Sequence, residues 1–179
     1  MSNPRSRSPD VVVRALAARS RRGQVQLGPP IYRCTLGRTG RRAMKREGDG
    51  ATPRGRFAVR QVFYRADRVA RPRAFCHVRP LAHRDGWCDA SGDRNYNRFV
   101  RHPYPASAER LWRADGLYDI VVVLGYNDRP RVQGRGSAIF MHVAHPDGTP
   151  TAGCIGLPRP QLLRLLARLN RGVFVRTDT

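Results

Sequence analysis

The most informative stretch of this chain is Gly136-Ser-Ala-Ile-Phe-Met-His-Val-Ala-His-Pro-Asp-Gly-Thr-Pro-Thr-Ala-Gly-Cys-Ile-Gly-Leu157. It opens with an apolar run that ends in His142, which predicts a buried strand with a histidine at its end. A loop with two prolines and a glycine then leads to a Thr-Ala-Gly-Cys turn that ends in Cys154. A strand that presents an imidazole and a tight turn that presents a thiol together predict a reactive cysteine site.

Cys154 is the candidate nucleophile and His142 the candidate base. The thiolate is the reactive form of cysteine, and a nearby imidazole lowers the thiol pKa and accepts its proton. A buried structural thiol and a satisfied core histidine are the alternative interpretations, and the pairing of the two residues favours the catalytic one. We expect an exposed thiol, so that Cys154→Ala leaves thermal stability nearly unchanged.

The turn before the cysteine predicts an oxyanion hole. Gly153 lets the backbone pass close to a bound carbonyl, and the amides of Ala152, Gly153 and Cys154 are the candidate donors. His145 competes with His142 for the role of base, but it lies past the expected strand, so a substrate contact or no role is left for it. Thr151 is placed with the substrate-binding residues, more through the shape of the turn than through chemistry.

Two motifs in this order resemble the L,D-transpeptidase (YkuD-type) catalytic domain. The first is the apolar strand that ends in His142, followed by Thr151-Ala-Gly-Cys-Ile155, and the second is the upstream turn Thr52-Pro-Arg-Gly-Arg-Phe57. The resemblance extends from Val11 to Arg176. The family often has His where this chain has Ala152 and Arg where it has Gly156, which indicates a divergent branch with a different grip on its substrate.

The resemblance implies a function and a location. Cys154 would attack the third residue of a peptidoglycan tetrapeptide stem, and an amine of another stem would resolve the thioester. A related L,D-carboxypeptidase or endopeptidase, or a transpeptidase with a different acceptor amine, is the alternative within enzymes. No metal or organic cofactor is implied. The family works in the periplasm or cell envelope, yet the sequence shows no signal peptide and no apolar stretch of membrane-spanning length.

Charge suggests an alternative from another class. The chain carries 34 Lys and Arg against 13 Asp and Glu, a net charge of +21, and Lys45 is its single lysine. Such a field favours polyanions, including nucleic acid, anionic lipid or an acidic wall polymer, although an Arg-rich composition that comes from a GC-rich genome explains it equally well. A nucleic-acid-binding module needs aromatics interleaved with basic residues on one face. The arginines are spread along the whole chain, so no nucleic-acid partner is expected, and a monomer is favoured.

Cysteine spacing and aromatic residues give two smaller hypotheses. Cys34, Cys76 and Cys88 form no zinc-binding pattern with the histidines, so no metal site is expected, and a Cys76–Cys88 disulfide stays open. The aromatic and polar segment 96–98 suits a peptide-binding rim, with the guanidinium able to hold a carboxylate, whereas Trp87 and Phe99 are expected in the core. The three rim residues are Tyr96, Asn97 and Arg98, for which a purely structural position is an equally good interpretation.

The length of 179 residues predicts a single mainly β domain over residues 10–179, after a disordered tail over residues 1–9. With the resemblance, this predicts a β-sandwich or barrel with one or two short helices. One helix is expected at Ser107–Asp115, and one opens at the prolines after Cys154 and ends at Gly172. The strands are expected at Val11–Ala15, Gly23–Leu27, Ile31–Leu36, Phe57–Tyr64, Tyr118–Tyr126, Ile139–His142 and Val173–Val175.

Overall fold

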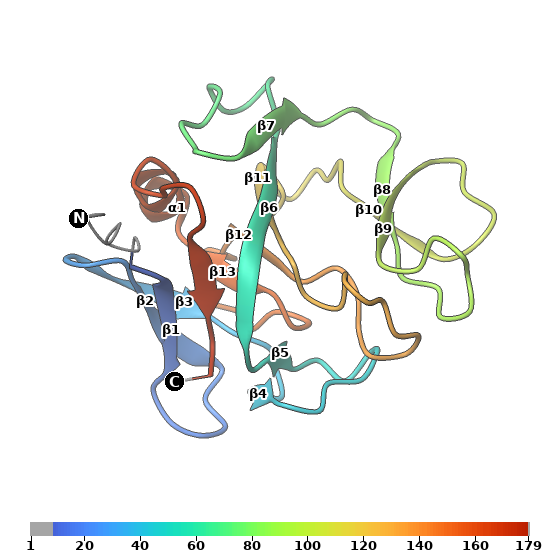
Figure 1. Ribbon diagram of the computed structural model, residues 1–179. Helices are drawn as coiled ribbons and strands as arrows, with labels where there is room; N and C mark the ends of the chain where they lie inside the picture. The colour runs from blue at the N-terminus through green and yellow to red at the C-terminus, as the bar shows by residue number, and fades with distance from the viewer. Residues whose placement is uncertain (1–8, 179) are drawn as a thin grey trace, which may run out of the picture.

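The computed structural model describes residues 9–178, and it is a closed β-barrel with one short helix (Figure 1). The expected tail over residues 1–9 lies outside the described part except for Pro9, which is exposed. Eight strands form the ring in the order β11, β12, β13, β3, β2, β1, β14 and β6, and the pairing of β6 with β11 closes it. Their bounds are β1 Val11–Ala15, β2 Arg22–Gln26, β3 Ile31–Thr35, β6 Arg56–Tyr64, β11 Ile120–Leu124, β12 Phe140–Val143, β13 Ile155–Leu157 and β14 Phe174–Arg176.

The long strand β6 provides the closure. Its first residues pair with β14, its last four pair in parallel with β7 (His77–Pro80) on the same edge, and its other edge pairs with β11. The segment that leads to β7 is rich in proline and arginine, and β7 lies at the end of the sheet. A strand that needs neighbours on both edges can be hydrophobic on both faces, as the buried end of β6 is.

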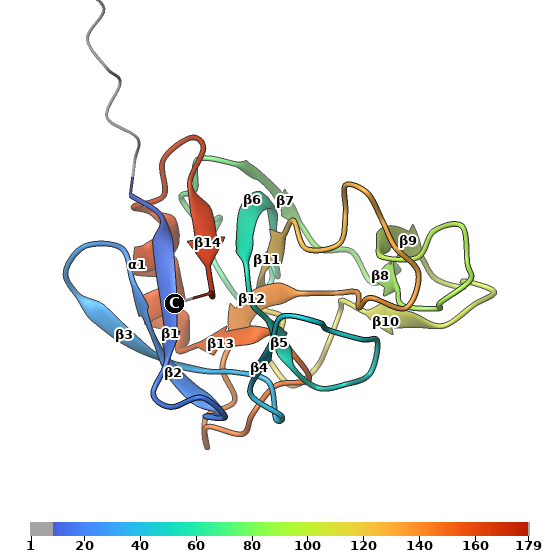
Figure 2. The ribbon, with the colours of Figure 1, turned by 60° about the horizontal axis from the view of Figure 1, so that its bottom comes forward.

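A smaller three-stranded sheet packs against one side of the barrel, and both ribbon views place it apart from the β1–β3 side (Figures 1 and 2). It consists of β8 (Asp85–Cys88) between β9 (Arg98–Arg101) and β10 (Ala108–Arg110). The expected helix at Ser107–Asp115 is therefore wrong. Ala108 pairs with Cys88 and Arg110 with Gly86, so sheet pairing outweighs the local helical pattern.

Two hydrophobic cores lie on either side of the wall made by β11 and β12. Ile120, Val122 and Leu124 point into the barrel, whereas Val121 and Val123 point toward the small sheet. This explains the all-apolar run of β11, whose five residues are all buried. The second core also contains Phe140, Trp87 and Cys154.

The helix α1 (Arg159–Leu166) follows the cysteine strand, as the Leu/Arg period predicts. Leu162, Leu165 and Leu166 are buried in the barrel core. The helix ends at Leu166 rather than at Gly172, which lies at φ +79° in the turn before β14. No helix among residues 9–178 has the length and apolarity needed to cross a membrane.

Candidate active site

The strand register brings His142 and Cys154 to one face of the sheet. β12 and β13 run parallel, with His142 opposite Gly156. Side chains alternate between the faces of a strand, so Cys154, two residues before Gly156, lies on the face of His142 and Phe140. The core clusters agree, because Phe140 and Cys154 belong to the outer cluster and their neighbours Met141 and Ile155 to the barrel interior.

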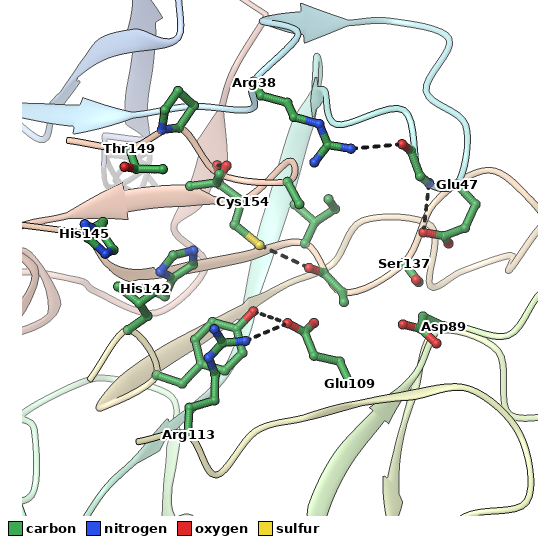
Figure 3. Close-up of a pocket in the computed structure, with 18 of the residues that line it drawn as sticks. Arg38, Glu47, Asp89, Glu109, Arg113, Ser137, His142, His145, Thr149 and Cys154 are labelled. Carbon is green, nitrogen blue, oxygen red and sulfur yellow. Dashed lines mark hydrogen bonds and ion pairs between the residues drawn. The ribbon is translucent and has the colours of Figure 1, made fainter. Parts of the chain in front are cut away.

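Both side chains line a cavity of about 470 Å³. Figure 3 shows the sulfur of Cys154 and the ring of His142 toward one end of it, with His145 and Thr149 beyond them. The cavity lies between the turn at 151–154, the loop that follows β3 and the small sheet, so residues from distant parts of the sequence meet there. Its lining includes Arg38, Lys45, Glu47, Asp89, Glu109, Arg113, Tyr118, Ser137, Ala138, Thr151 and Ala152.

Cys154 is held by two hydrogen bonds. Its Sγ donates to the carbonyl of Ala138 at 3.2 Å and accepts from the amide of Phe140 at 3.3 Å. The residue is 7% exposed, so the expectation of an exposed thiol is wrong, although the side chain lines the cavity. Burial, followed by the negative charge of Glu109, raises the pKa of the Cys154 thiol to about 12, so the sulfur keeps its proton at neutral pH.

His142 is fixed in the tautomer of a base. Its Nδ1 lies 2.8 Å from the carbonyl oxygen of Val143, which can only accept, so Nδ1 carries the proton and Nε2 keeps its lone pair. The ring also packs edge-on against Tyr118, with centroids 5.2 Å apart. Burial lowers the pKa of His142 to about 4, and the imidazole is therefore neutral at neutral pH.

The resting pair is consequently a thiol with a neutral imidazole, rather than a thiolate with an imidazolium. Neither group tolerates charge in this buried position, because desolvation is the largest cause of both shifts. This resting state is the starting point for general base catalysis, in which a neutral imidazole takes the proton of a thiol as the thiol attacks a substrate.

The turn at 151–154 is locked by threonine hydroxyls. Thr151 Oγ1 accepts from the Gly153 amide at 3.1 Å and donates to the Cys154 carbonyl at 2.6 Å. The amide of Gly153 is therefore already occupied, and Gly153 is absent from the cavity lining, which favours Ala152 and Cys154 as oxyanion donors. Gly153 lies at φ +139°, and a Cβ there would come within 2.7 Å of the Ala51 carbonyl, so only glycine fits.

The upstream Thr-Pro motif supports this turn from below. Thr52, which opens the two-residue strand β5 (Thr52–Pro53), is fully buried. Its Oγ1 accepts from the Gly37 amide at 2.9 Å and lies 3.4 Å from the Cys154 carbonyl as a donor. The parallel partner of β5 is β4 (Arg41–Arg42). The two motifs that carry the family resemblance are thus in direct contact.

Local packing explains why position 156 is a glycine. A Cβ at this position would lie 2.4 Å from Thr35 Oγ1 and 3.2 Å from the Cα of Ala144. Thr35 on the neighbouring strand therefore occupies the space that a side chain at position 156 would need. An arginine there, as the family often has, is incompatible with this packing.

The expected substrate contacts fall into two groups. His145 and Thr151 line the cavity, and His145 Nδ1 lies 2.6 Å from Asp147. Tyr96, Asn97 and Arg98 are not part of its lining. Tyr96 and Asn97 are buried, and they hold the segment before β12 because Tyr96 Oη accepts from the Gly136 amide at 2.9 Å and Asn97 Oδ1 from the Ala138 amide at 3.1 Å.

Through these contacts, Tyr96 and Asn97 hold the segment before β12 in place, while Arg98 is exposed on β9. The expected core positions of Trp87 and Phe99 agree with the structure, since Trp87 is buried and Phe99 packs against the same cluster. Sequence reasoning missed the three carboxylates of the cavity, Glu47, Asp89 and Glu109. No local motif marks them, and only the fold brings them together.

No group of three or more His, Cys, Asp or Glu side chains within residues 9–178 is arranged to hold a metal ion. All four cysteines are free thiols, including Cys76 and Cys88.

Comparison with known families gives one result. Residues 14–176 match the model of YkuD, the L,D-transpeptidase catalytic domain. Searches of curated proteins and of solved structures gave no match. The matched range reaches from the end of β1 to the end of β14 and includes the candidate nucleophile and base.

Proposed function

Because the chain belongs to the YkuD family of L,D-transpeptidase catalytic domains, we propose that it is a peptidoglycan L,D-transpeptidase with Cys154 as nucleophile and His142 as base. The observation that carries the proposal is the pair itself. A thiol and an imidazole whose Nδ1 is held by a backbone carbonyl line the same cavity, on neighbouring parallel strands. That is the requirement for acyl transfer through a thioester.

In the first half-reaction, Cys154 Sγ attacks the carbonyl carbon of the third residue of a tetrapeptide stem while His142 Nε2 takes its proton. The amides of Ala152 and Cys154 donate hydrogen bonds to the carbonyl oxygen and stabilise the negative charge that develops on it. The C–N bond then breaks, and His142 returns its proton to the departing nitrogen of the terminal D-alanine. A thioester on Cys154 remains, and the imidazole is neutral again.

In the second half-reaction, an amine of another stem attacks the thioester carbon. His142 accepts the proton that the nitrogen loses, and the C–S bond breaks with return of the proton to sulfur. The product is a cross-linked stem dimer. With water as the acceptor, the same intermediate gives an L,D-carboxypeptidase or endopeptidase, so the alternatives differ only in what resolves the thioester.

Arg38 is the best-placed cation for a substrate carboxylate. It lines the cavity, and the one hydrogen bond that its side chain makes among the described residues is a long contact of 3.4 Å from Nη2 to the Gly48 carbonyl. The other cavity cations have close partners: Lys45 lies 2.7 Å from Asp49, and Arg113 forms an ion pair with Asp115. We therefore assign the terminal carboxylate of the donor stem to Arg38.

The partners that follow are donor and acceptor stem peptides, and the location that follows is the periplasm or cell envelope. Incubation of the purified protein with disaccharide-tetrapeptide, with mass spectrometry of the products, tests the proposal. Stem dimers and released D-alanine are expected from the wild type and not from Cys154→Ser, which keeps the hydrogen-bonding pattern. Release of D-alanine without dimers would assign the hydrolase alternative, and no release would refute the proposed function.

A further inference from the structure

Three carboxylates line the cavity on the side away from His145. Glu47 comes from the loop between β4 and β5, Asp89 directly follows β8, and Glu109 lies in the middle of β10. In Figure 3, Glu109, Asp89 and Glu47 all lie on the side of the Cys154 sulfur that faces away from His145. The carboxylates thus form an acidic side of the cavity, with Arg38 near Glu47 and Arg113 near Glu109, and His145 lies on the opposite side of the sulfur.

The three acids have few cationic partners, although Glu47 accepts from the Tyr96 hydroxyl at 2.5 Å and Glu109 from the Tyr118 hydroxyl at 2.6 Å. Glu47 and Asp89 have no ion pair among residues 9–178, although the chain carries 34 Lys and Arg. The nearest cation to Glu109 is Arg113 at 3.9 Å, and the Nε of Arg113 is bound more closely to Asp115, at 3.1 Å.

Two polar atoms at this side have no partner within the described part of the chain. They are Oδ1 of Asp89 and Oγ of Ser137, and both residues line the cavity. Ser137 is only 6% exposed, and Figure 3 shows it between Glu47 and Asp89. Buried polar atoms are normally hydrogen-bonded, so an orphaned hydroxyl beside an orphaned carboxylate oxygen points to a ligand that supplies donors.

We propose that Glu47, Asp89, Glu109 and Ser137 form a subsite for an alkylammonium group of the substrate, next to Cys154. An ammonium has three N–H donors and a positive charge, which match carboxylate oxygens and a hydroxyl acceptor. No group of three or more acidic, His or Cys side chains in the described part of the chain is arranged to hold a metal ion, so an organic cation is the better match.

The assignment of the ammonium group to a stem peptide rests on the proposed function, because stem peptides supply the amines of that reaction. The ammonium belongs either to the acceptor stem, which must be held near the thioester, or to the donor stem that is being acylated. Both sources share the same recognition chemistry, and the kinetic steps that they affect are different.

The subsite also bears on the nucleophile. The negative charge of Glu109 is, after burial, the next cause of the raised pKa of Cys154. A bound ammonium would compensate that charge and favour ionisation of the thiol. Occupation of the acidic side would then make the cysteine more reactive at the moment when substrate is present.

The binding test uses n-butylammonium as the probe and n-butanol as its neutral counterpart. Saturation-transfer NMR on the wild-type protein should show binding of n-butylammonium that is at least tenfold tighter than that of n-butanol. Glu47→Gln, Asp89→Asn and Glu109→Gln should each weaken it about tenfold, the size of one charge-assisted hydrogen bond. Asp93→Asn is the matched control, because Asp93 also has no ion pair in the described chain and lies outside the cavity lining.

The kinetic test separates the two sources. If the subsite holds the acceptor, the carboxylate variants raise the KM for the acceptor stem several-fold and leave the rate of thioester formation with donor alone unchanged. If it holds the donor, thioester formation itself slows. Circular dichroism melting confirms that each variant is folded before either measurement.

Equal binding of n-butylammonium to the wild type and to all three folded variants would overturn the subsite, as would binding no tighter than that of n-butanol. Failure of the proposed function looks different. A wild-type protein that forms no thioester on Cys154, but still binds n-butylammonium through these carboxylates, would retain the subsite and lose the transpeptidase.

Discussion

The resting state of Cys154 makes a quantitative prediction about its reactivity. A pKa raised from 9.0 to about 12 lowers the thiolate population at pH 7 about a thousandfold relative to an unperturbed cysteine. A more basic thiolate is a better nucleophile, and with a Brønsted coefficient of about 0.45 this recovers roughly twentyfold. Cys154 should therefore react with iodoacetamide roughly fiftyfold more slowly than N-acetylcysteine amide at pH 7.

The assay follows the peptide that contains Cys154 by mass spectrometry, so that the other three cysteines do not interfere. The rate should keep rising with pH beyond 9, without a plateau, for as long as the protein stays folded. Glu109→Gln should raise the rate at pH 7, because it removes a charge that opposes the thiolate, and Asp93→Asn should not. A rate equal to that of the reference thiol, with an inflection below pH 9, would show a resting thiolate and refute the general-base account.

Three further predictions concern the support of the site. Thr52→Val should lower the free energy of unfolding by about 1–3 kcal/mol in a denaturant titration, because the buried amide of Gly37 loses its acceptor. Thr52→Ser keeps the hydroxyl and should retain most of this stability. Equal stability of the two variants would contradict the prediction. Gly153→Ala should abolish acylation of Cys154, because its Cβ would meet the Ala51 carbonyl, whereas Gly172→Ala shares the positive φ, has no atom within 4 Å of its Cβ and should remain active. His142 has a folded pKa of about 4 against 6.5, so between these values the unfolded state binds a proton that the folded state does not, and stability rises with pH across this window. The free energy of unfolding of the wild type should fall as the pH drops from 6.5 to 4, and His142→Asn should make this fall smaller by up to about 3 kcal/mol. Parallel pH–stability curves for the two proteins would contradict the lowered pKa of His142.

Local sequence patterns predicted much of the barrel. Alternation in Gln24-Val-Gln and the β-branched run of β11 indicate strands, because each pattern matches a half-buried or a fully buried sheet position. The Leu/Arg period after Cys154 likewise predicts α1. The family resemblance then supplied the closed mainly β architecture, which the strand patterns alone do not determine.

The failures have a physical cause. Segment 107–115 has a helical pattern, but pairing with Gly86–Cys88 fixes it as the edge strand β10, and that partner lies far away in the sequence. The position of Tyr96 has the same origin. Its aromatic ring and hydroxyl suit a substrate rim, yet the fold buries it under the catalytic strand, where it binds the Gly136 amide.

The candidate site was predictable where its parts are close in sequence and not elsewhere. His142, Thr151 and Cys154 belong to one short stretch, and the residue types reveal their chemistry. Glu109 and Asp89 reach the same cavity from the small sheet of β8, β9 and β10, which no sequence motif predicts. The exposure of the thiol also depends on packing, since Phe140 and Ala138 cover it through backbone groups that any residues at those positions would provide.

The central claim is that Cys154 is an acylating nucleophile assisted by His142. The most direct measurement is the intact mass of the folded protein after exposure to a carbapenem, followed by peptide mapping. One adduct per chain on Cys154 is predicted for the wild type, with no adduct in Cys154→Ser and a much slower one in His142→Asn. No adduct on Cys154, or an adduct whose rate is indifferent to His142, would contradict it.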